Sequence, residues 1–356
     1  MKVKDKNYSS IWDEKGVVKI IDQTKLPFEF RVIELKTLSD FCNAIKKMKV
    51  RGAPLIGVTA AYAVSSLIKN NSSNSYIKNI YTSLLNTRPT AVNLKWALDK
   101  IIYKIQKTNV KNKKEKAYNL ARSIRDNDIV NCQKIAANGY KIIEKYYKQK
   151  KKPINILTHC NAGWLATVDW GTAISPIFLA HRNGIPVHVW VDETRPRNQG
   201  ALLTAWELKN EKVPYTIVTD NSGGYLMQEN KVDLCIVGSD RVVANGDVCN
   251  KIGTYLKAIS ASENNIPFFV ALPTSTIDLN LKTGKNIPIE IRDEKELSTI
   301  KIKKDSKTIE GTIYFDRAKV YNPAFDVTPH RYITKLITEK GVIDCNKGAI
   351  KKLMKL

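Results

Sequence analysis

The sequence predicts an α/β protein in which a small N-terminal domain of antiparallel sheet and helices precedes a larger domain built on a parallel sheet. Two observations carry this prediction. After Pro153, short apolar runs recur every 20 to 35 residues with helix-like segments between them, which is typical of a parallel sheet covered on both faces. Before Pro153, short alternating runs are followed by longer segments of helical periodicity. We expect the first domain over residues 1–125 and the second over 126–356.

The N-terminal elements follow from their periodicity. The runs VVKIID and FEFRVIEL predict a small antiparallel sheet. An amphipathic helix is expected from Thr37 to Lys49, and the apolar run LIGVTAAYAVSSLI predicts a buried helix with Pro54 in its first turn. Residues 70–74 form a polar loop in this interpretation, and further helices are expected over about 76–86, 91–107 and 112–149.

Five strands are predicted in the second domain, from INILTHC, VHVWVDE, YTIVTD, LCIVGSD and FFVALP. Each ends in polar or reactive side chains, namely Cys160, Asp192 with Glu193, Asp220, Asp240 and Thr274. Ligands of open parallel sheets bind outside the carboxyl ends of the strands, so we expect these five ends to meet in one crevice. No GxGxxG motif follows the first strand, which argues against a dinucleotide cofactor.

Composition excludes several classes of protein. With 356 residues, 43% hydrophobic, the chain can bury a sizeable core and is not globally disordered. No apolar run has the length of a membrane span, and MKVKDKNYSS lacks the apolar segment of a secretory signal, so a cytoplasmic protein is expected. The six cysteines form no CxxC pair and no zinc-spaced group with histidine, which indicates reduced thiols and no metal site.

A net charge of +24 raises the question of nucleic acid. Residues 100–152 hold 16 basic and 4 acidic side chains, whereas residues 153–253 hold 8 and 10. The excess is therefore a lysine-dominated helical stretch without the arginine and aromatic interleaving of a base-stacking surface. We interpret it as a solvated face and expect no nucleic-acid partner.

Two residues could carry chemistry. Cys160 closes the first strand, and the turn Asn161-Ala162-Gly163 after it is expected to open a helix whose dipole would favour thiolate; the alternative is a buried structural cysteine. Asp240, at the end of LCIVGSD, fits a general acid and base with a raised pKa and fits a helix N-cap equally well. His159 points to the other face of its strand and is interpreted as a packed or hydrogen-bonded histidine.

Several cations stand just before predicted helices, where backbone N–H groups favour anions. They occur in Arg51-Gly52-Ala53-Pro54, Arg88-Pro89-Thr90, Glu193-Thr194-Arg195-Pro196 and Asn250-Lys251-Ile252-Gly253. One such place would be a weak signal, but several together indicate a phosphorylated small molecule.

Taken together, the motifs resemble the methylthioribose-1-phosphate isomerase family. The matching blocks span about the whole chain in order: RGAPLIGVTAAYA (51–63), RPTAVNLKWAL (88–98), LTHCNAGWLAT (157–167), VDETRPRNQGALLTAWEL (191–208), GSDRVVANGDVCNKIGTY (238–255), LPTSTID (272–278), IPIE (287–290) and NPAFDVTPHRYITKLITEKGVI (322–343).

The resemblance implies a Rossmann-like second domain, a homodimer, and conversion of 5-methylthioribose 1-phosphate to 5-methylthioribulose 1-phosphate in methionine salvage without metal or nucleotide. It implies Cys160 and Asp240 as the catalytic pair. The substrate contacts that it implies are Arg51, Gly52, Ala53, Arg88, Gln199, Asn250 and Lys251.

Phosphate on the anomeric oxygen prevents the sugar from opening to a free aldehyde. Our hypothesis is that protonated Asp240 donates to the ring oxygen while Cys160 removes the C2 proton or stabilises the transition state for its loss. A direct hydride shift from C2 to C1, with Cys160 only shaping an apolar site, is the competing route.

Other functions stay open. Ser222-Gly223 stand where the family more often has Met-Ala, which leaves 5-deoxyribose 1-phosphate as a main or additional substrate. Ribose-1,5-bisphosphate isomerases use the same pair but bind a second phosphate. The regulatory alpha, beta and delta subunits of the translation-initiation exchange factor share the fold as binding proteins without the pair.

Overall fold

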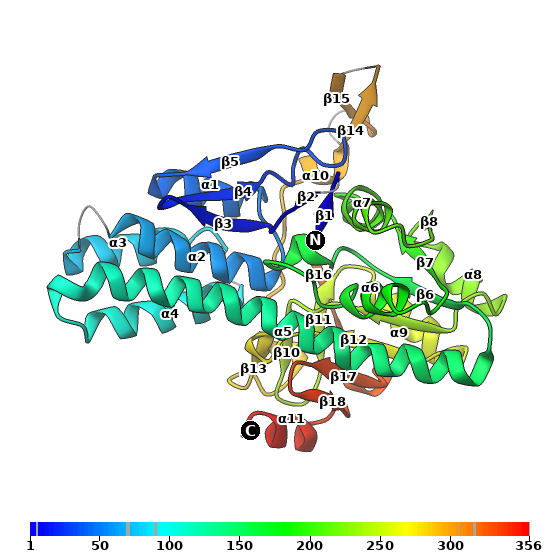
Figure 1. Ribbon diagram of the computed structural model, residues 1–356. Helices are drawn as coiled ribbons and strands as arrows, with labels where there is room; N and C mark the ends of the chain where they lie inside the picture. The colour runs from blue at the N-terminus through cyan, green and yellow to red at the C-terminus, as the bar shows by residue number, and fades with distance from the viewer. Residues whose placement is uncertain (5, 69–71, 89–90, 306, 316–317, 356) are drawn as a thin grey trace.

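The computed structural model describes residues 1–4, 6–68, 72–88, 91–305, 307–315 and 318–355. It has a mostly helical N-terminal half and a sheet-centred C-terminal half, joined by the long helix α5 (Lys113–Lys150). This helix runs along both halves in Figure 1. The architecture confirms the predicted α/β class.

The N-terminal half packs one small sheet on a layer of helices. The sheet has the antiparallel order β3-β4-β5, in which Ile20 pairs with Ile11 and with Ile33. A capping box between Thr37 and Asp40 starts the first helix. The bounds are β1 (Lys2–Val3), β2 (Lys6–Asn7), β3 (Ile11–Glu14), β4 (Val17–Ile21), β5 (Val32–Leu35), α1 (Leu38–Lys46), α2 (Ala53–Leu67), α3 (Asn74–Leu85), α4 (Val92–Gln106) and η1 (Val110–Asn112).

The predicted helices of this half are confirmed with small shifts at their ends. The first ends at Lys46, three residues early, and α3 begins at Asn74, which the sequence assigned to a loop. Residues 70 and 71 of that loop lie outside the described residues. The FEF part of FEFRVIEL is not a strand, because only Val32–Leu35 pairs with β4.

The C-terminal half is built on a sheet with the order β18-β17-β12-β9-β6-β7-β8, parallel except for the β17–β18 pair at one edge. Alternate side chains serve two cores, with Ile154 and Ile156 on the side of α5 and α6 and Leu157 on the side of α8 and α9. All five predicted strands are confirmed. The bounds are β6 (Ile154–Thr158), β7 (Val187–Asp192), β8 (Tyr215–Val218), β9 (Leu234–Val237), β12 (Phe268–Ala271), β17 (Lys335–Thr338), β18 (Gly341–Ile343), α6 (Ser175–Arg182), α7 (Ala205–Asn210), α8 (Ser222–Gln228), α9 (Thr254–Glu263) and α11 (Lys347–Leu353).

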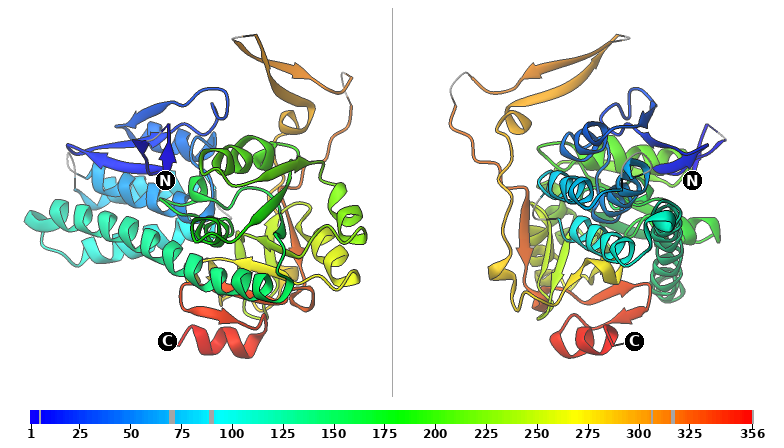
Figure 2. Two further views of the ribbon diagram at one scale, coloured as in Figure 1. Left: turned by 45° about the vertical axis from the view of Figure 1, so that its right-hand side comes forward. Right: turned by 90° about the vertical axis from the view of Figure 1, so that its left-hand side faces the viewer.

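A second sheet, which the sequence did not predict, has the order β13-β10-β11-β16 and lies next to the site. Its strands are short, and short apolar runs carry little period-2 signal. After it, α10 (Lys295–Ser298) leads into a hairpin that projects from the body in both views of Figure 2. The bounds are β10 (Arg241–Val243), β11 (Val248–Lys251), β13 (Ile277–Asp278), β16 (Phe325–Thr328), β14 (Thr299–Lys304) and β15 (Lys307–Thr312).

The proposed boundary between residues 125 and 126 falls inside α5. Ala117, Ala121 and Ile124 belong to the N-terminal core, whereas Ile135 and Ile143 belong to the core of the large sheet. We keep the division as a proposal based on this change of core along one continuous helix. Among the described residues, no helix combines the length and the apolar character needed to cross a membrane.

Candidate active site

Cys160 follows β6 in a left-handed backbone conformation, with φ of 66°. Neighbours fix this unusual geometry from two sides. The Cys160 N–H donates to Thr194 Oγ1 at 2.8 Å, and Thr204 Oγ1 donates to the Cys160 carbonyl at 2.7 Å. The thiol itself lies 3.5 Å from Gln199 Oε1, which accepts from it. A non-glycine residue held in this region costs about 1–3 kcal/mol, and such residues cluster at functional sites.

The expected helix after Cys160 is wrong. The chain makes a short 3₁₀ turn, η2 (Trp164–Ala166), and the next α-helix begins only at Ser175. Because Glu207 occupies the space beside Gly163, where a Cβ would lie 1.7 Å from Glu207 Oε2, the turn wraps around a buried carboxylate instead. The prediction that a helix dipole favours the thiolate form of Cys160 is therefore wrong.

Electrostatics leave Cys160 protonated at rest. Burial raises the pKa of the thiol, and the charge of Asp240 raises it further, whereas Arg51 and Lys251 lower it. Only 8% of the residue is exposed. A neutral thiol in this position is a weak hydrogen-bond donor and a poor base.

Asp240 lies at the turn between β9 and β10, with its N–H donating to the Cys249 carbonyl at 2.9 Å. The N-cap alternative is excluded, because a strand and not a helix follows it. Burial raises the pKa of Asp240, against the opposing charges of Arg88, Lys251 and Arg51. Burial therefore favours the protonated form of this carboxyl group, although three cations act on it electrostatically.

Arg51 is a buried cation next to the Cys160 turn. Its two terminal nitrogens donate to Asn161, one to Oδ1 and the other to the carbonyl at 2.6 Å. Asn161 Nδ2 in turn donates to Glu207 Oε1 at 2.9 Å, and Glu207 also accepts from the Trp164 and Leu165 N–H groups. Burial raises the pKa of Glu207 to about 7. Glu207 thus fixes the turn that carries both Cys160 and the Arg51 partner.

Arg88 and Lys251 share the ring of Phe325. The Lys251 ammonium lies 4.8 Å and the Arg88 guanidinium carbon 6.0 Å from the ring centroid. Arg88 Nη2 forms a 3.3 Å ion pair with Glu290, while its buried Nε has no hydrogen-bond partner among the described residues. Burial lowers the pKa of Lys251, while Cys160 and Asp240 raise it. The two cations therefore reach the proposed catalytic pair and keep N–H groups available for an anion.

The remaining predicted residues are Gly52, Ala53, Gln199 and Asn250. Gly52, with φ of 91°, packs so closely that a Cβ would lie 2.3 Å from the Ala166 carbonyl oxygen, and it leads Arg51 into α2 at Ala53. Gln199 contacts the thiol as described above. Asn250 is different, because its Nδ2 donates to Thr254 Oγ1 at the start of α9. Its side chain supports the turn after Lys251 rather than the described cluster of cations.

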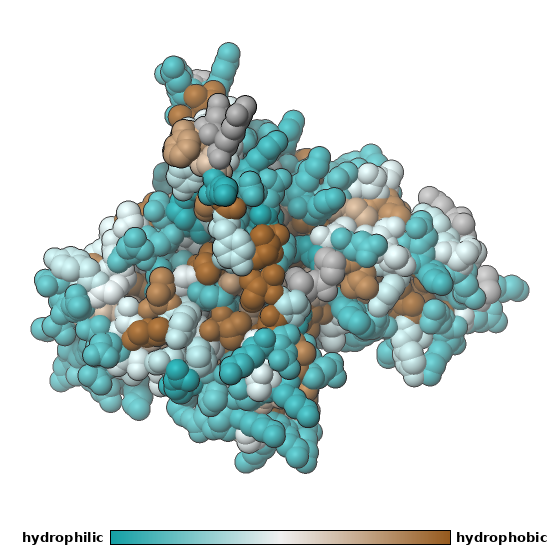
Figure 3. All heavy atoms as spheres, turned by 180° about the vertical axis from the view of Figure 1, so that it is seen from behind, coloured by the Kyte–Doolittle hydropathy of each residue, from teal (hydrophilic) through white to brown (hydrophobic). Residues whose placement is uncertain are grey.

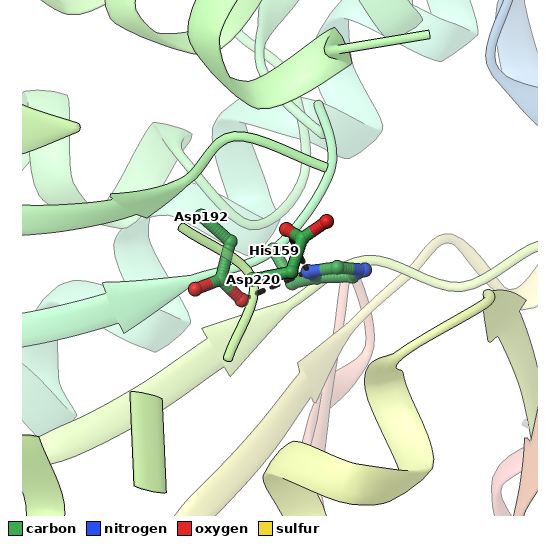
Figure 4. Close-up of side chains that lie close together, drawn as sticks. All are labelled: His159, Asp192 and Asp220. Atoms are coloured by element: carbon green, nitrogen blue, oxygen red, sulfur yellow. Dashed lines mark hydrogen bonds and ion pairs between the residues drawn. The ribbon is translucent and has the colours of Figure 1, made fainter. Parts of the chain in front are cut away.

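Behind Cys160, the ends of β6, β7 and β8 bring together His159, Asp192 and Asp220, whose ligand atoms lie within 4.8 Å of one another (Figure 4). His159 Nδ1 lies 2.8 Å from Asp192 Oδ2, and Nε2 donates to the Ile252 carbonyl at 2.8 Å. The Lys257 ammonium is 3.2 Å from the same Asp192 oxygen. Since protein cations already neutralise this carboxylate, the group is better suited to tying strand ends together than to binding a metal ion.

The carboxyl ends of the five predicted strands lie at one edge of the sheet, because these strands are parallel neighbours in the order β12-β9-β6-β7-β8. Thr274, after β12, donates its N–H to Glu339 at 2.9 Å. Gly223, at the start of α8, would place a Cβ 3.2 Å from Leu157 and 3.8 Å from Lys257. This position packs against the sheet and the His159 group, so it has no direct contact with the thiol.

Sequence reasoning missed four residues that shape the site, namely Thr194, Glu207, Glu290 and Phe325. Glu290 and Phe325 stand in blocks that carried the resemblance, but nothing in their local pattern marks them as neighbours of Arg88. Thr194 and Glu207 act through hydrogen bonds to residues more than 30 positions away in the chain, which spacing in the sequence does not reveal.

Residues 49–345 match the Initiation factor 2 subunit family. Methylthioribose-1-phosphate isomerase of Sinorhizobium medicae is 52% identical over 359 residues, which cover 99% of each chain. The protein of the same name from Escherichia coli O45:K1 is 51% identical, over 98% of this chain and 95% of that one.

Solved structures agree with this assignment. The crystal structure of 5-methylthioribose 1-phosphate isomerase from Pyrococcus horikoshii OT3 superposes with a TM-score of 0.85 at 39% identity, covering 98% of this chain and 96% of that one. A structure described as translation initiation factor eIF-2B, subunit delta, from A. fulgidus gives a TM-score of 0.80 at 37% identity, covering 98% and 100%.

Proposed function

The chain belongs to the Initiation factor 2 subunit family and, within it, to the methylthioribose-1-phosphate isomerases, and on that premise we propose that Asp240 and Cys160 isomerise 5-methylthioribose 1-phosphate in its crevice. The protein is an aldose–ketose isomerase, that is, an intramolecular oxidoreductase of methionine salvage. The observation that carries the proposal is one buried carboxyl group with a raised pKa beside a buried thiol and three cations.

The cations suit the substrate phosphate. Arg51, Arg88 and Lys251 all act electrostatically on Asp240, so an anion that they bind lies within reach of its carboxyl group. Arginine and lysine N–H groups form charge-assisted bonds to phosphate. The phosphate would hold C1 of the sugar beside Asp240 and Cys160.

In the proposed reaction, protonated Asp240 donates its proton to the ring oxygen as the bond from C1 to that oxygen breaks. Asp240, now a carboxylate, takes the C2 proton, which gives an enol phosphate. It returns that proton to C1 and takes the proton of the C2 hydroxyl, so that the C2 carbonyl completes the ketose and Asp240 is protonated again. Burial of the thiol supports the version in which neutral Cys160 stabilises the transition state, because a protonated thiol is a poor base. In the competing route, a hydride moves directly from C2 to C1.

The test is turnover by wild type, Cys160→Ala and Asp240→Asn with 5-methylthioribose 1-phosphate, 5-deoxyribose 1-phosphate and ribose 1,5-bisphosphate. Acid–base groups contribute on the order of 10²–10⁴ in rate, so both variants should lose that much. Cys132→Ala and Asp128→Asn, at buried positions on α5, are matched controls that should keep wild-type turnover. Folded wild type that turned over none of the three sugars would favour a binding protein instead.

Substrate deuterated at C2 separates the two routes. A hydride shift carries the label to C1 in every turnover, whereas proton transfer to a group that exchanges with water washes it out. Full retention over many turnovers would contradict the proton-transfer version.

The homodimer implied by the resemblance and a cytoplasmic location are further parts of this proposal. Apolar side chains gather on the back face below the projecting hairpin in Figure 3. On the hairpin itself Ile302 is 44% and Ile309 41% exposed, and Phe315 just after it is 82% exposed. Contiguous exposed apolar surface is typical of association sites. Analytical ultracentrifugation should therefore give twice the chain mass of 40.2 kDa.

A further inference from the structure

Residues 290–298, which we call the clasp, pass between the two halves of the molecule. The clasp begins as a short bridge to the chain before β16, because the Ala324 N–H donates to the Glu290 carbonyl and the Arg292 N–H to the Asn322 carbonyl, each at 2.9 Å. It ends in α10, which leads to the projecting hairpin (Figure 1).

A continuous chain of ion pairs runs through the clasp. Glu290 joins Arg88 at 3.3 Å and Arg292 at 2.8 Å. Arg292 then forms two bonds to Glu296, at 2.6 and 2.7 Å, and Glu296 binds Arg197 at 2.7 Å. The inner members are well covered, with 13% of the Arg292 side chain and 12% of the Glu296 side chain exposed.

One end of this chain is a residue of the proposed active site, and the other end lies in the loop that carries Gln199. Arg88 is a proposed phosphate ligand at one end. Arg197 at the other end precedes Gln199 by two residues, and Gln199 accepts from the Cys160 thiol. Arg195, in the same loop, donates to the Leu297 carbonyl at 2.7 Å. The clasp therefore contacts this loop at two points, Glu296 and Leu297.

The charges of the chain are unbalanced in a way that points to an anion. Three arginines face two glutamates, which leaves one positive charge, and Arg88 Nε is buried without a hydrogen-bond partner. Although burial raises it, hydrogen bonds and charges from Arg292 and Arg197 hold the pKa of Glu296 at about 2. The inner pairs therefore stay ionised at neutral pH, and a phosphate at Arg88 would balance the excess.

We propose that Arg292 and Glu296 are positioning residues that couple a phosphate at Arg88 to the placement of Gln199 beside Cys160. The inference rests on the proposed function for the identity of the phosphate ligand. Neither residue touches the thiol or the carboxyl group of Asp240, so each acts through the ends of the chain. Bidentate arginine–carboxylate pairs suit this role because their geometry is fixed in two directions.

Glu296→Gln tests the coupling, because it keeps the shape of the side chain and removes its charge. Inorganic phosphate is titrated into the full-length protein by calorimetry, and kcat and KM are measured with 5-methylthioribose 1-phosphate. Networks of this kind change coupling by roughly twofold to thirtyfold, so we expect phosphate affinity and kcat to fall, and KM to rise, by factors in that range. Removal of a negative charge would by itself strengthen phosphate binding, so a loss of affinity reports lost positioning, and a gain of affinity would overturn the inference. The matched control is Glu211→Gln, which breaks a 2.6 Å pair with Arg182 that shares no residue with the clasp chain and should leave phosphate affinity, kcat and KM unchanged.

A double variant gives the decisive comparison. In an Arg88→Met background, Glu296→Gln should have no further effect on phosphate affinity, because the route to the phosphate is already cut. Wild-type phosphate affinity and kcat in folded Glu296→Gln would overturn the inference, as would an undiminished effect in the Arg88→Met background or no phosphate binding by wild type.

Two provisions keep the test decisive. If Glu296→Gln does not fold, Arg197→Lys replaces it, because the Arg197 side chain is 29% exposed. Lysine keeps the charge but loses the planar guanidinium, so phosphate affinity should change in the same direction. Phosphate binding decides the coupling even if wild type turns over no sugar, an outcome that would refute only the proposed function.

Discussion

Thr194→Val tests whether the conformation of Cys160 affects turnover independently of the stability of the fold. Thr194 is fully buried, and its Oγ1 accepts from the Cys160 N–H at 2.8 Å and donates to the Asp192 carbonyl at 2.9 Å. Valine keeps the shape but leaves both groups without this partner, and a buried unpaired group costs about 1–3 kcal/mol. We expect a loss of about 2–4 kcal/mol in the free energy of unfolding in urea.

The effect on turnover follows from the strained backbone of Cys160. With φ of 66° costing about 1–3 kcal/mol, one lost restraint lets the residue relax. Since about 1.4 kcal/mol is tenfold in rate, kcat on 5-methylthioribose 1-phosphate should fall about tenfold to a hundredfold.

Thr338→Val is the matched control. Thr338 is equally buried, and its Oγ1 donates to the Gly341 carbonyl at 2.9 Å and accepts from the Lys340 N–H at 3.2 Å. It should lose similar stability and keep kcat. If Thr194→Val loses stability but keeps kcat within about twofold of wild type, the held conformation of Cys160 has no part in turnover and the reasoning fails.

Three further predictions concern separate features. Burial raises the pKa of Asp128 to about 7, so the free energy of unfolding of wild type should fall as pH rises towards 7. The advantage of Asp128→Asn over wild type in urea unfolding should therefore grow by about 3 kcal/mol between pH 5 and pH 8. Gly52→Ala should cost about 2–4 kcal/mol, because its Cβ would lie 2.3 Å from the Ala166 oxygen, whereas Gly184→Ala, with φ of 77° and open space, should cost less in the same assay. Phe325→Leu removes the ring beside the arginine and the lysine and should raise KM about tenfold without a change in secondary structure by circular dichroism.

The sequence predicted the large sheet well because its strands are buried on both faces. Continuous apolar runs with polar ends mark such strands clearly, and the helix limits were correct to within a few residues. The second sheet was missed because β10 and β11 are three and four residues long and their outer partners are distant in the chain. β10 pairs with β13, and β11 pairs with β16, more than 70 residues later.

The candidate site shows the same division between local and distant causes. Cys160 and Asp240 could be singled out because strand ends are local features, and Arg51, Arg88 and Lys251 because they stand just before predicted helices. The turn after Cys160 was predicted wrongly as the start of a helix. Its shape is set by the buried Glu207 carboxylate more than 40 residues away, and no pattern within the turn encodes that contact.

Asp240 shows how substrate binding could set the protonation state on which the proposed reaction depends. In the free protein, burial raises the pKa of Asp240 while Arg88, Lys251 and Arg51 lower it. A bound phosphate neutralises these cations and adds its own negative charge, so the pKa of Asp240 should rise further when the substrate binds. The carboxyl group would then hold its proton when the ring oxygen needs it.

This argument predicts different pH profiles for the two kinetic parameters. Because kcat/KM reports the free enzyme and kcat the enzyme–substrate complex, the loss of kcat at high pH should occur at a higher pH than the loss of kcat/KM. Both should fall as pH rises, since the active form of Asp240 is the protonated one. Asp240→Asn provides the control, because its residual activity should lack this limb. Coincident limbs, or a kcat limb at lower pH, would mean that the phosphate does not reach the cations that act on Asp240.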